Sequence, residues 1–477
     1  MKSALLLAVS WASARGAHAH GFEERYDLPV PLAYVVAGAC ATVLLTFVVA
    51  VFFVRQPMAD FPPPDDKGQH PDQTPDSHWL AKALAWLLFA LTITSALGGT
   101  SDPLMNLAPT MIWIVWWVGL SFAVLLLGNF WPTIDPWRTT FDLMDAGARK
   151  LGVTRGLSLG WAWPERLGAW PAVMFLLAWC WLEVVYPIAT SPFKLGCAAL
   201  AWSALNLAGM VCFGRDVWQR HADVFALYFS ALGRLAPIQF TARPPAITIR
   251  SWGAGLIGTP HTRVAGTTGF VLAMLSTVLF DGLHGSAAWT VFEGALRRLA
   301  PQWIDVNGYF AGTMGLLTVW LLFLAAYVVT CGLCARLIKP SPGPGSGVAM
   351  AAQFAPTLIP IAAAYNVAHN FSSLLIQGQT IFQLLSDPLG RQWDLFGTAK
   401  WYPDIGLVDA RLTWTVAVVS IVFGHVLSIW LAHRIALAWR MSPLRTALAS
   451  TPLTALMVAY TAISLTVIAE PMVTYTP

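Results

Sequence analysis

Ten long apolar stretches constrain the fold of this 477-residue chain more than any other feature of its sequence. They cover residues 31–54, 79–97, 109–128, 168–189, 194–214, 264–283, 308–335, 350–376, 412–433 and 448–468. A helix of about 20 apolar residues crosses a bilayer, and these stretches lack the polar–apolar alternation of a membrane β-barrel strand. The sequence therefore predicts an all-α, polytopic helical membrane protein with about ten transmembrane helices.

The charge content supports this class and excludes others. Only 11% of the residues are charged and the mean hydropathy is +0.61, whereas soluble chains carry about 25% charged residues. An ordinary soluble enzyme, a disordered chain and a nucleic-acid-binding chain are all excluded. The predicted partner is the lipid bilayer, with no role for nucleic acid.

The N-terminus has the pattern of a secretory signal peptide. Lys2 supplies the positive charge, residues 4–12 form a short apolar core, and Ala17-His18-Ala19 is a small-x-small cleavage site. We predict cleavage of residues 1–19, which leaves a single transmembrane domain over residues 20–477 and His20 as the new N-terminus. An uncleaved anchor is the alternative.

The distribution of positive charge predicts the topology. If the mature chain starts outside and the ten helices alternate, 19 of the 28 Lys and Arg residues fall on the inner side. This is the bias that the positive-inside rule describes. Both mature termini are therefore predicted to lie outside.

Ionisable residues inside membrane helices are costly and are candidates for function. His369 lies in the eighth predicted helix and His425 in the ninth, while Asp281, His284 and Glu470 lie near the outer ends of the sixth and tenth. Two acidic residues of outward loops, Asp102 and Asp387, are predicted to face the same side. We expect an outward polar cleft in which histidines and carboxylates gather. Imidazole and carboxylate together suit a divalent metal ion, although no spacing here is a metal signature.

Several other segments have simpler interpretations. Residues 219–235 and 284–299 are predicted to be amphipathic helices lying on the membrane. The run NFWPTIDPWRTTFD (129–142) indicates a structural turn, with Trp137 as an interface anchor and Arg138 as a topology determinant. The Cys331-x-x-Cys334 pair is predicted to stay reduced and to serve packing.

Several of these stretches resemble a family of bacterial multi-spanning membrane proteins, the fenitrothion hydrolases. The resembling parts are HGFEERYDLPVPL (20–32), NFWPTIDPWRT (129–139), YNVAHNFSSLLIQGQ (365–379), SDPLGRQWDLFG (386–397) and GHVLSIWLAHRIAL (424–437). The resemblance implies a hydrolase of the bacterial cytoplasmic (inner) membrane. Its substrate would be an apolar organophosphorus triester, cleaved at the P–O–aryl bond. The family supplies no catalytic residues to carry over.

For such an enzyme, we predict that His369, Asp281 and His284 form a centre that holds a metal and a water. A bound metal would lower the pKa of the water and polarise phosphorus. Asp102, Asp387 or Glu470 would be a further ligand or the general base, and His425 a deeper ligand. His20, as a terminal residue, could chelate copper through its amine and ring. The sequence leaves open whether a partner subunit is required.

Two other functions remain open at this stage. A membrane transporter or metal-handling protein would use a vertical series of Asp281, His284, His369, His425 and His433. This series crosses the membrane, which a hydrolase does not need. A haem-binding redox subunit would use His369 and His425 as axial ligands.

Overall fold

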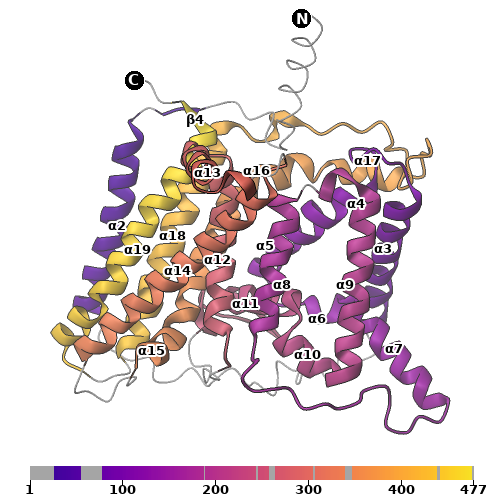
Figure 1. Cartoon of the computed structure of the whole chain (residues 1–477), viewed down its shortest axis with the longest axis horizontal. Coiled ribbons are helices and arrows are strands. Elements are labelled where there is room, and N and C mark those ends of the chain that lie inside the picture. Colours follow the sequence, from indigo (N-terminus) through magenta and orange to yellow (C-terminus); the bar gives the residue numbers. More distant parts are fainter. Residues whose placement is uncertain are drawn as a thin grey trace, which may run out of the picture.

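The computed structural model describes residues 26–28, 30–54, 78–186, 188–242, 245–256, 264–303, 307–338, 346–437 and 441–474. The predicted signal peptide and His20 lie outside these residues. The described chain is a slab of helices that run between two ends, called upper and lower as they stand in Figure 1. The described loops that connect the helices lie at these ends.

Within the described residues, nine helices are long and apolar enough to cross a membrane. Seven of these spans are the helices α2 (Leu32–Phe53), α3 (Trp79–Gly98), α9 (Pro192–Phe213), α12 (Thr267–His284), α14 (Tyr309–Ile338), α18 (Ala410–Leu437) and α19 (Pro443–Met472). Two spans are composite: α4 (Leu107–Pro109), η2 (Thr110–Gly119) and α5 (Leu120–Leu127) form one, and α15 (Gly347–Phe354), η7 (Ala355–Leu358) and α16 (Ile359–Gln377) form the other. The prediction of an all-α, polytopic helical membrane protein is confirmed.

The stretch predicted as the fourth helix, 168–189, is shorter than expected. Helix α8 (Trp170–Cys180) continues into one π-helical segment, η3 (Trp181–Val185), and the 16-residue helix ends at Val185. Tyr186 takes an extended conformation just before Pro187, which disfavours helix at the residue that precedes it. The sequence therefore overestimated this helix.

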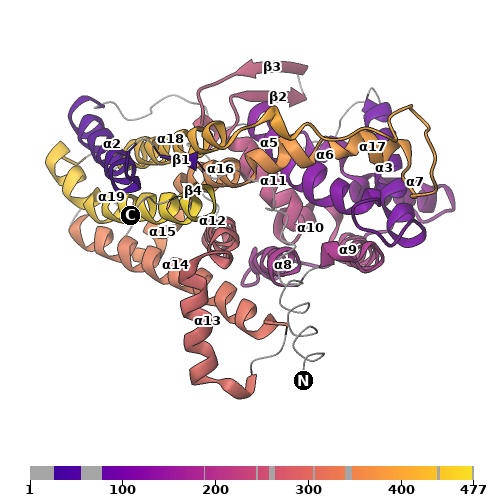
Figure 2. The same cartoon turned by 90° about the horizontal axis from the view of Figure 1, so that it is seen from above.

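The remaining elements lie at the two ends of the slab or between the spans. They are β1 (Tyr26–Asp27), α6 (Trp131–Ile134), α7 (Pro136–Lys150), η4 (Ile188–Thr190), α10 (Arg215–His221), α11 (Val224–Leu235), β2 (Ile238–Ala242), β3 (Pro245–Ile249), η5 (Ala254–Leu256), α13 (Ala287–Leu299), η6 (Pro301–Trp303), α17 (Thr380–Ser386), η8 (Ile405–Leu407) and β4 (Val473–Thr474). Strands β1 and β4 pair in parallel, and β2 and β3 form an antiparallel hairpin. Figure 2 shows the hairpin and α13 at opposite edges of the bundle.

One of the two predicted surface helices is buried instead. Helix α11 buries Phe225, Tyr228, Phe229 and Leu232 and packs against α5, α8 and α16. Its side chains are apolar around most of the helix, which favours an interior position over a membrane surface. Helix α13 is amphipathic as predicted, and within it only Trp289 is buried.

The spans form two groups, which we call the aromatic half and the polar half. The aromatic half comprises α3 to α11, and the polar half comprises α2, α12, α14, α15, α16, α18 and α19. Helices α12 and α16 of the polar half contact α8, η2 and α11 of the aromatic half. The junction between the halves therefore runs along α12 and α16.

Small residues set the close packing inside the polar half. A side chain at Gly424 of α18 would place its Cβ 2.5 Å from the Ala364 Cβ and 2.7 Å from the Pro360 carbonyl oxygen of α16. A side chain at Gly282 of α12 would meet the Tyr365 hydroxyl at 2.8 Å. Glycine at membrane helix contacts lets backbones approach closely. These contacts fix α16 between α12 and α18.

Candidate functional site

One pair of ionisable side chains is brought together at the junction of the two halves. His369 Nε2 of α16 lies 2.8 Å from Asp281 Oδ2 of α12. The His369 side chain is 13% exposed and the Asp281 side chain 33% exposed. The pair is therefore held inside the bundle but remains reachable. A carboxylate bonded to an imidazole fixes the orientation of the ring and stabilises its protonated form.

Polar groups from three further segments, together with Asn366 of α16 itself, lie around this pair. Glu183 of η3 lies near enough to Asp281 for their charges to interact, and Glu183 hydrogen bonds with the Trp117 indole of η2. Asn366 Nδ2 of α16 donates to the Tyr228 hydroxyl of α11 at 3.0 Å. Both π-helical segments, η2 and η3, reach this cluster, and π-helical turns occur frequently at functional sites.

A second row of polar groups continues from the pair into the polar half. The Tyr365 ring stacks on the His369 ring with 6.3 Å between centroids, and Tyr365 interacts electrostatically with Tyr460 of α19. The Tyr460 ring lies 5.7 Å from the ring of His425. This row follows the vertical series that the sequence suggested as far as His425.

Three buried polar atoms of α16 and α18 near this row have no hydrogen-bond partner among the described residues. They are the Tyr365 hydroxyl, Asn366 Oδ1 and His425 Nε2. His425 Nδ1 donates to the Ile421 carbonyl at 2.8 Å, so Nε2 is the acceptor nitrogen of a neutral ring. Polar atoms at membrane depth are ordinarily satisfied by protein or by ordered water. These three atoms are therefore the places in the row where a hydrogen bond from water would fit.

The other predicted site residues have structural contacts. Glu470 Oε2 accepts from the Ala287 backbone N–H at 2.9 Å, at the start of α13. His284 lies against the rings of Phe280 and Trp289. These contacts join the upper ends of α12 and α19 to α13.

The two loop carboxylates stabilise turns at the upper end. Asp102 Oδ1 accepts from the Leu104 backbone N–H at 2.9 Å. Asp387 accepts from the backbone N–H groups of Arg391 and Gln392 at 2.8 and 2.7 Å. Their oxygens shape their own loops.

A metal centre has no support from the donor set. Among the residues that the structure describes, no group of three or more His, Cys, Asp and Glu side chains is placed to hold a metal ion. Of the residues expected to form it, His369 and Asp281 are hydrogen bonded to each other. Cys331 and Cys334 lie one turn apart on α14 and are both free thiols.

The 129–142 motif forms a turn, as predicted, but its side chains are buried. Asp135 caps α7 by accepting from the backbone N–H groups of Trp137 and Arg138, and its Oδ2 accepts from Gln219 Nε2 at 2.6 Å. Trp137 is 5% exposed and Arg138 is 8% exposed. Trp137 therefore packs into the interior rather than standing at the surface as an interface anchor, and the role of Arg138 as a topology determinant stays a prediction.

Two buried carboxylates at the lower end have unusual acidity. Burial, together with the nearby charge of Asp223, raises the pKa of Asp135 to about 8. Burial raises the pKa of Asp223 to about 6, although backbone N–H groups at the start of α11 oppose the shift. Both residues cap helices, and they couple α7, α10 and α11 into one network.

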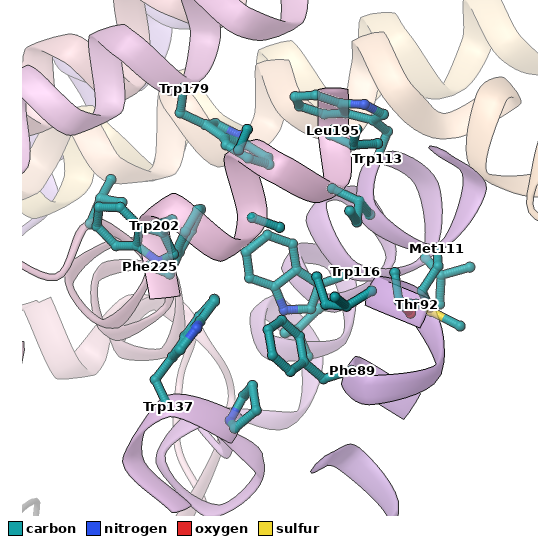
Figure 3. A pocket seen from close by; sticks show the side chains of 18 of the residues that line it. Phe89, Thr92, Met111, Trp113, Trp116, Trp137, Trp179, Leu195, Trp202 and Phe225 are labelled. Carbon is teal, nitrogen blue, oxygen red and sulfur yellow. The ribbon is translucent and has the colours of Figure 1, made fainter. Parts of the chain in front are cut away.

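A large cavity lies in the aromatic half, and no sequence pattern predicted it. It has a volume of about 360 Å³ and is lined by residues from α3, η2, α8, α9 and α11 and from the α6–α7 turn. Figure 3 shows rings that surround it, including Trp113, Trp116, Trp137, Trp179 and Trp202. The 24 tryptophans of the chain were the available signal, but nothing in their spacing shows which rings meet around one cavity.

Comparison with known proteins adds no assignment. No protein-family model, curated protein or solved structure matches this chain. The functional argument therefore rests on the residues described above.

Proposed function

We propose that this protein is a membrane-embedded hydrolase of uncharged organophosphorus triesters, with His369 and Asp281 as its general-base pair. The observation that carries the proposal is the 2.8 Å contact between His369 Nε2 and Asp281 Oδ2 inside a membrane bundle. Ionisable side chains in such a setting are costly and are retained for function. Their orientation is fixed by α12 and α16, which the Gly282–Tyr365 contact holds together.

The pair supplies the proton transfer that hydrolysis of a triester needs. A water oxygen bonds to phosphorus, the P–O–aryl bond breaks, and the aryl oxide leaves. The His369–Asp281 pair takes up the proton that the attacking water loses. A positioned general base contributes about 10²–10⁴-fold to such a step. Uncharged triesters partition into lipid, so a site at membrane depth suits them.

The test is nitrophenol release from a nitrophenyl thionophosphate triester by washed membranes, from a host without organophosphate hydrolases. We expect release by the wild type, with a loss of about 10²–10⁴-fold in His369→Ala at matched expression. His433→Ala is the matched control. His433 lies near the lower end of α18, where its Nε2 donates to the Val54 carbonyl, and it is not part of the pair. Wild-type membranes without release, or equal losses in both variants, contradict the proposal. A parallel assay with chelator tests the metal requirement.

A second candidate function is proton-coupled transport along the row from Asp281 to His425. The observation that favours it is the set of three buried, unpartnered polar atoms beside this row. Proteoliposomes with an internal pH dye test it: His425→Ala should lower proton flux in a transporter. In a hydrolase, the same variant should keep nitrophenol release within about twofold.

A further inference from the structure

The aromatic cavity has the properties of a binding site, and the His369–Asp281 pair is not part of it. None of its lining residues is charged, and nine are aromatic. Its volume of about 360 Å³ lies within the range of small-molecule sites, roughly 300–1,000 Å³. A cavity of this size is large for a close-packed interior, where voids larger than a water molecule are few.

The lining residues exclude a charged occupant. With no Lys, Arg, His, Asp or Glu in the wall, an ion inside would lose its hydration without gaining an opposite charge. The aromatic faces instead favour a planar ring, because rings stack or meet edge to face. Trp116 shows this geometry among the wall residues: its ring lies 4.5 Å from that of Phe225 and 5.9 Å from that of Trp179.

The wall also contains buried hydrogen-bond donors that have no acceptor among the described residues. The indole N–H groups of Trp113, Trp131, Trp179 and Trp202 are buried and have no acceptor among the described residues. Trp137 differs, since its N–H donates to Ser203 Oγ at 2.8 Å. A buried tryptophan N–H usually finds a partner. An occupant with acceptor oxygens can supply that partner when a ring turns toward it.

We propose that this cavity binds a neutral, planar aromatic or quinonoid molecule that carries acceptor oxygens. Such a molecule enters from the bilayer, where it partitions. A nitroaryl ester and a membrane quinone share this chemistry. The inference rests on the cavity alone and does not use the proposed hydrolysis.

The test is equilibrium dialysis with the protein in lipid nanodiscs, with protein-free nanodiscs as the background. The probes are 4-nitroanisole and menadione, a saturated control, cyclohexyl methyl ether, and a charged control, 4-nitrobenzoate. Ala198→Phe on α9 and Ala178→Phe on α8 each place a ring in the cavity, since both alanines line it. Ala204→Phe adds the same ring to an exposed position on α9 outside the lining.

We expect saturable binding of at least one ring probe. Either cavity variant should weaken it by about tenfold or more, while Ala204→Phe leaves it unchanged. Binding of 4-nitroanisole alone assigns the site to aryl esters, and binding of menadione alone assigns it to quinones. Equal binding of the saturated or the charged control overturns the inference, as does unchanged binding in a folded cavity variant or no binding of either ring probe to the wild type.

Discussion

The two halves of this protein pack their interiors with different kinds of side chain. The aromatic half fills its interior with rings and encloses a cavity without charged side chains. The polar half brings its helices so close that Gly424 has no room for a side chain, and it buries a row of ionisable and hydroxyl groups. Rings leave gaps because they are large and rigid, whereas small residues allow backbones to meet.

This difference separates two tasks. The aromatic half offers apolar space and the polar half offers proton chemistry, and the His369–Asp281 pair lies where the two meet. The halves should therefore respond to different substitutions. Added volume should destabilise the polar half and be tolerated in the aromatic cavity, whereas loss of an ionisable side chain should reduce activity at the His369–Asp281 pair and leave the cavity, which has none, unchanged.

The largest expected effect on stability is in the polar half. Gly424→Val should destabilise the protein by about 3 kcal/mol or more, because its Cβ would overlap Ala364 and the Pro360 carbonyl. The measurement is SDS-induced unfolding in mixed micelles. Gly38→Val on α2 is the control, since a Cβ there meets nothing within 4 Å. Equal losses in the two variants would mean that the α16–α18 contact is not tight.

A pH effect is expected in the aromatic half. The folded protein holds a proton on Asp135, whose pKa is raised to about 8, at pH values where the unfolded chain has lost it. Stability should therefore fall as the pH rises from about 5 to about 8, by up to about 1.4 kcal/mol per pH unit, and level off above about 8. Asp135→Asn should flatten this slope.

Asp145→Asn is the control for the pH experiment. The partners Arg149 and Leu157 lower the pKa of Asp145, so it stays ionised in both states over this range. The slope should persist in this variant. A slope that is unchanged in Asp135→Asn assigns the proton to another group.

A smaller effect on stability is expected from two tryptophans of the cavity lining, which differ in whether their indole N–H has an acceptor among the described residues. Trp137→Phe removes the hydrogen bond to Ser203, whereas Trp113→Phe removes an N–H without an acceptor. Trp137→Phe should therefore cost about 1 kcal/mol more unfolding free energy than Trp113→Phe, measured in the same micelles. Equal costs would show that the Trp113 N–H has a partner in the membrane.

The smallest effect is expected at the loop carboxylates. Asp102→Ala and Asp387→Ala should keep nitrophenol release within about twofold, because both carboxylates accept backbone hydrogen bonds in their own turns. A large loss of turnover with unchanged stability would return these residues to the catalytic role that the sequence suggested. The assay is the washed-membrane reaction at matched expression.

Much of the fold was predictable because apolar length alone defines a membrane span. The exceptions are local: Pro187 ends the fourth stretch early, and α11 is apolar on too many sides to lie on a surface. The β2–β3 hairpin was missed, since its strands follow a buried helix without any span-length signal.

The site was less predictable. The position of a residue along its helix predicts its depth in the membrane, but it does not predict which side chains are in contact. Depth and side suggested His369 with Asp281, and the structure places them in contact. The same reasoning grouped Glu470, Asp102 and Asp387 with them, although each has a backbone partner of its own. The cavity depends on six chain segments at once, so no sequence pattern marks it.

The central claim is that His369 and Asp281 act as one unit. The most direct measurement is a double-mutant cycle of nitrophenol release with His369→Gln, Asp281→Asn and the double variant. We predict that each single variant loses about 10²–10⁴-fold and that the double variant loses little more than either. Losses that multiply in the double variant, or a His369→Gln variant that stays fully active, would contradict the account.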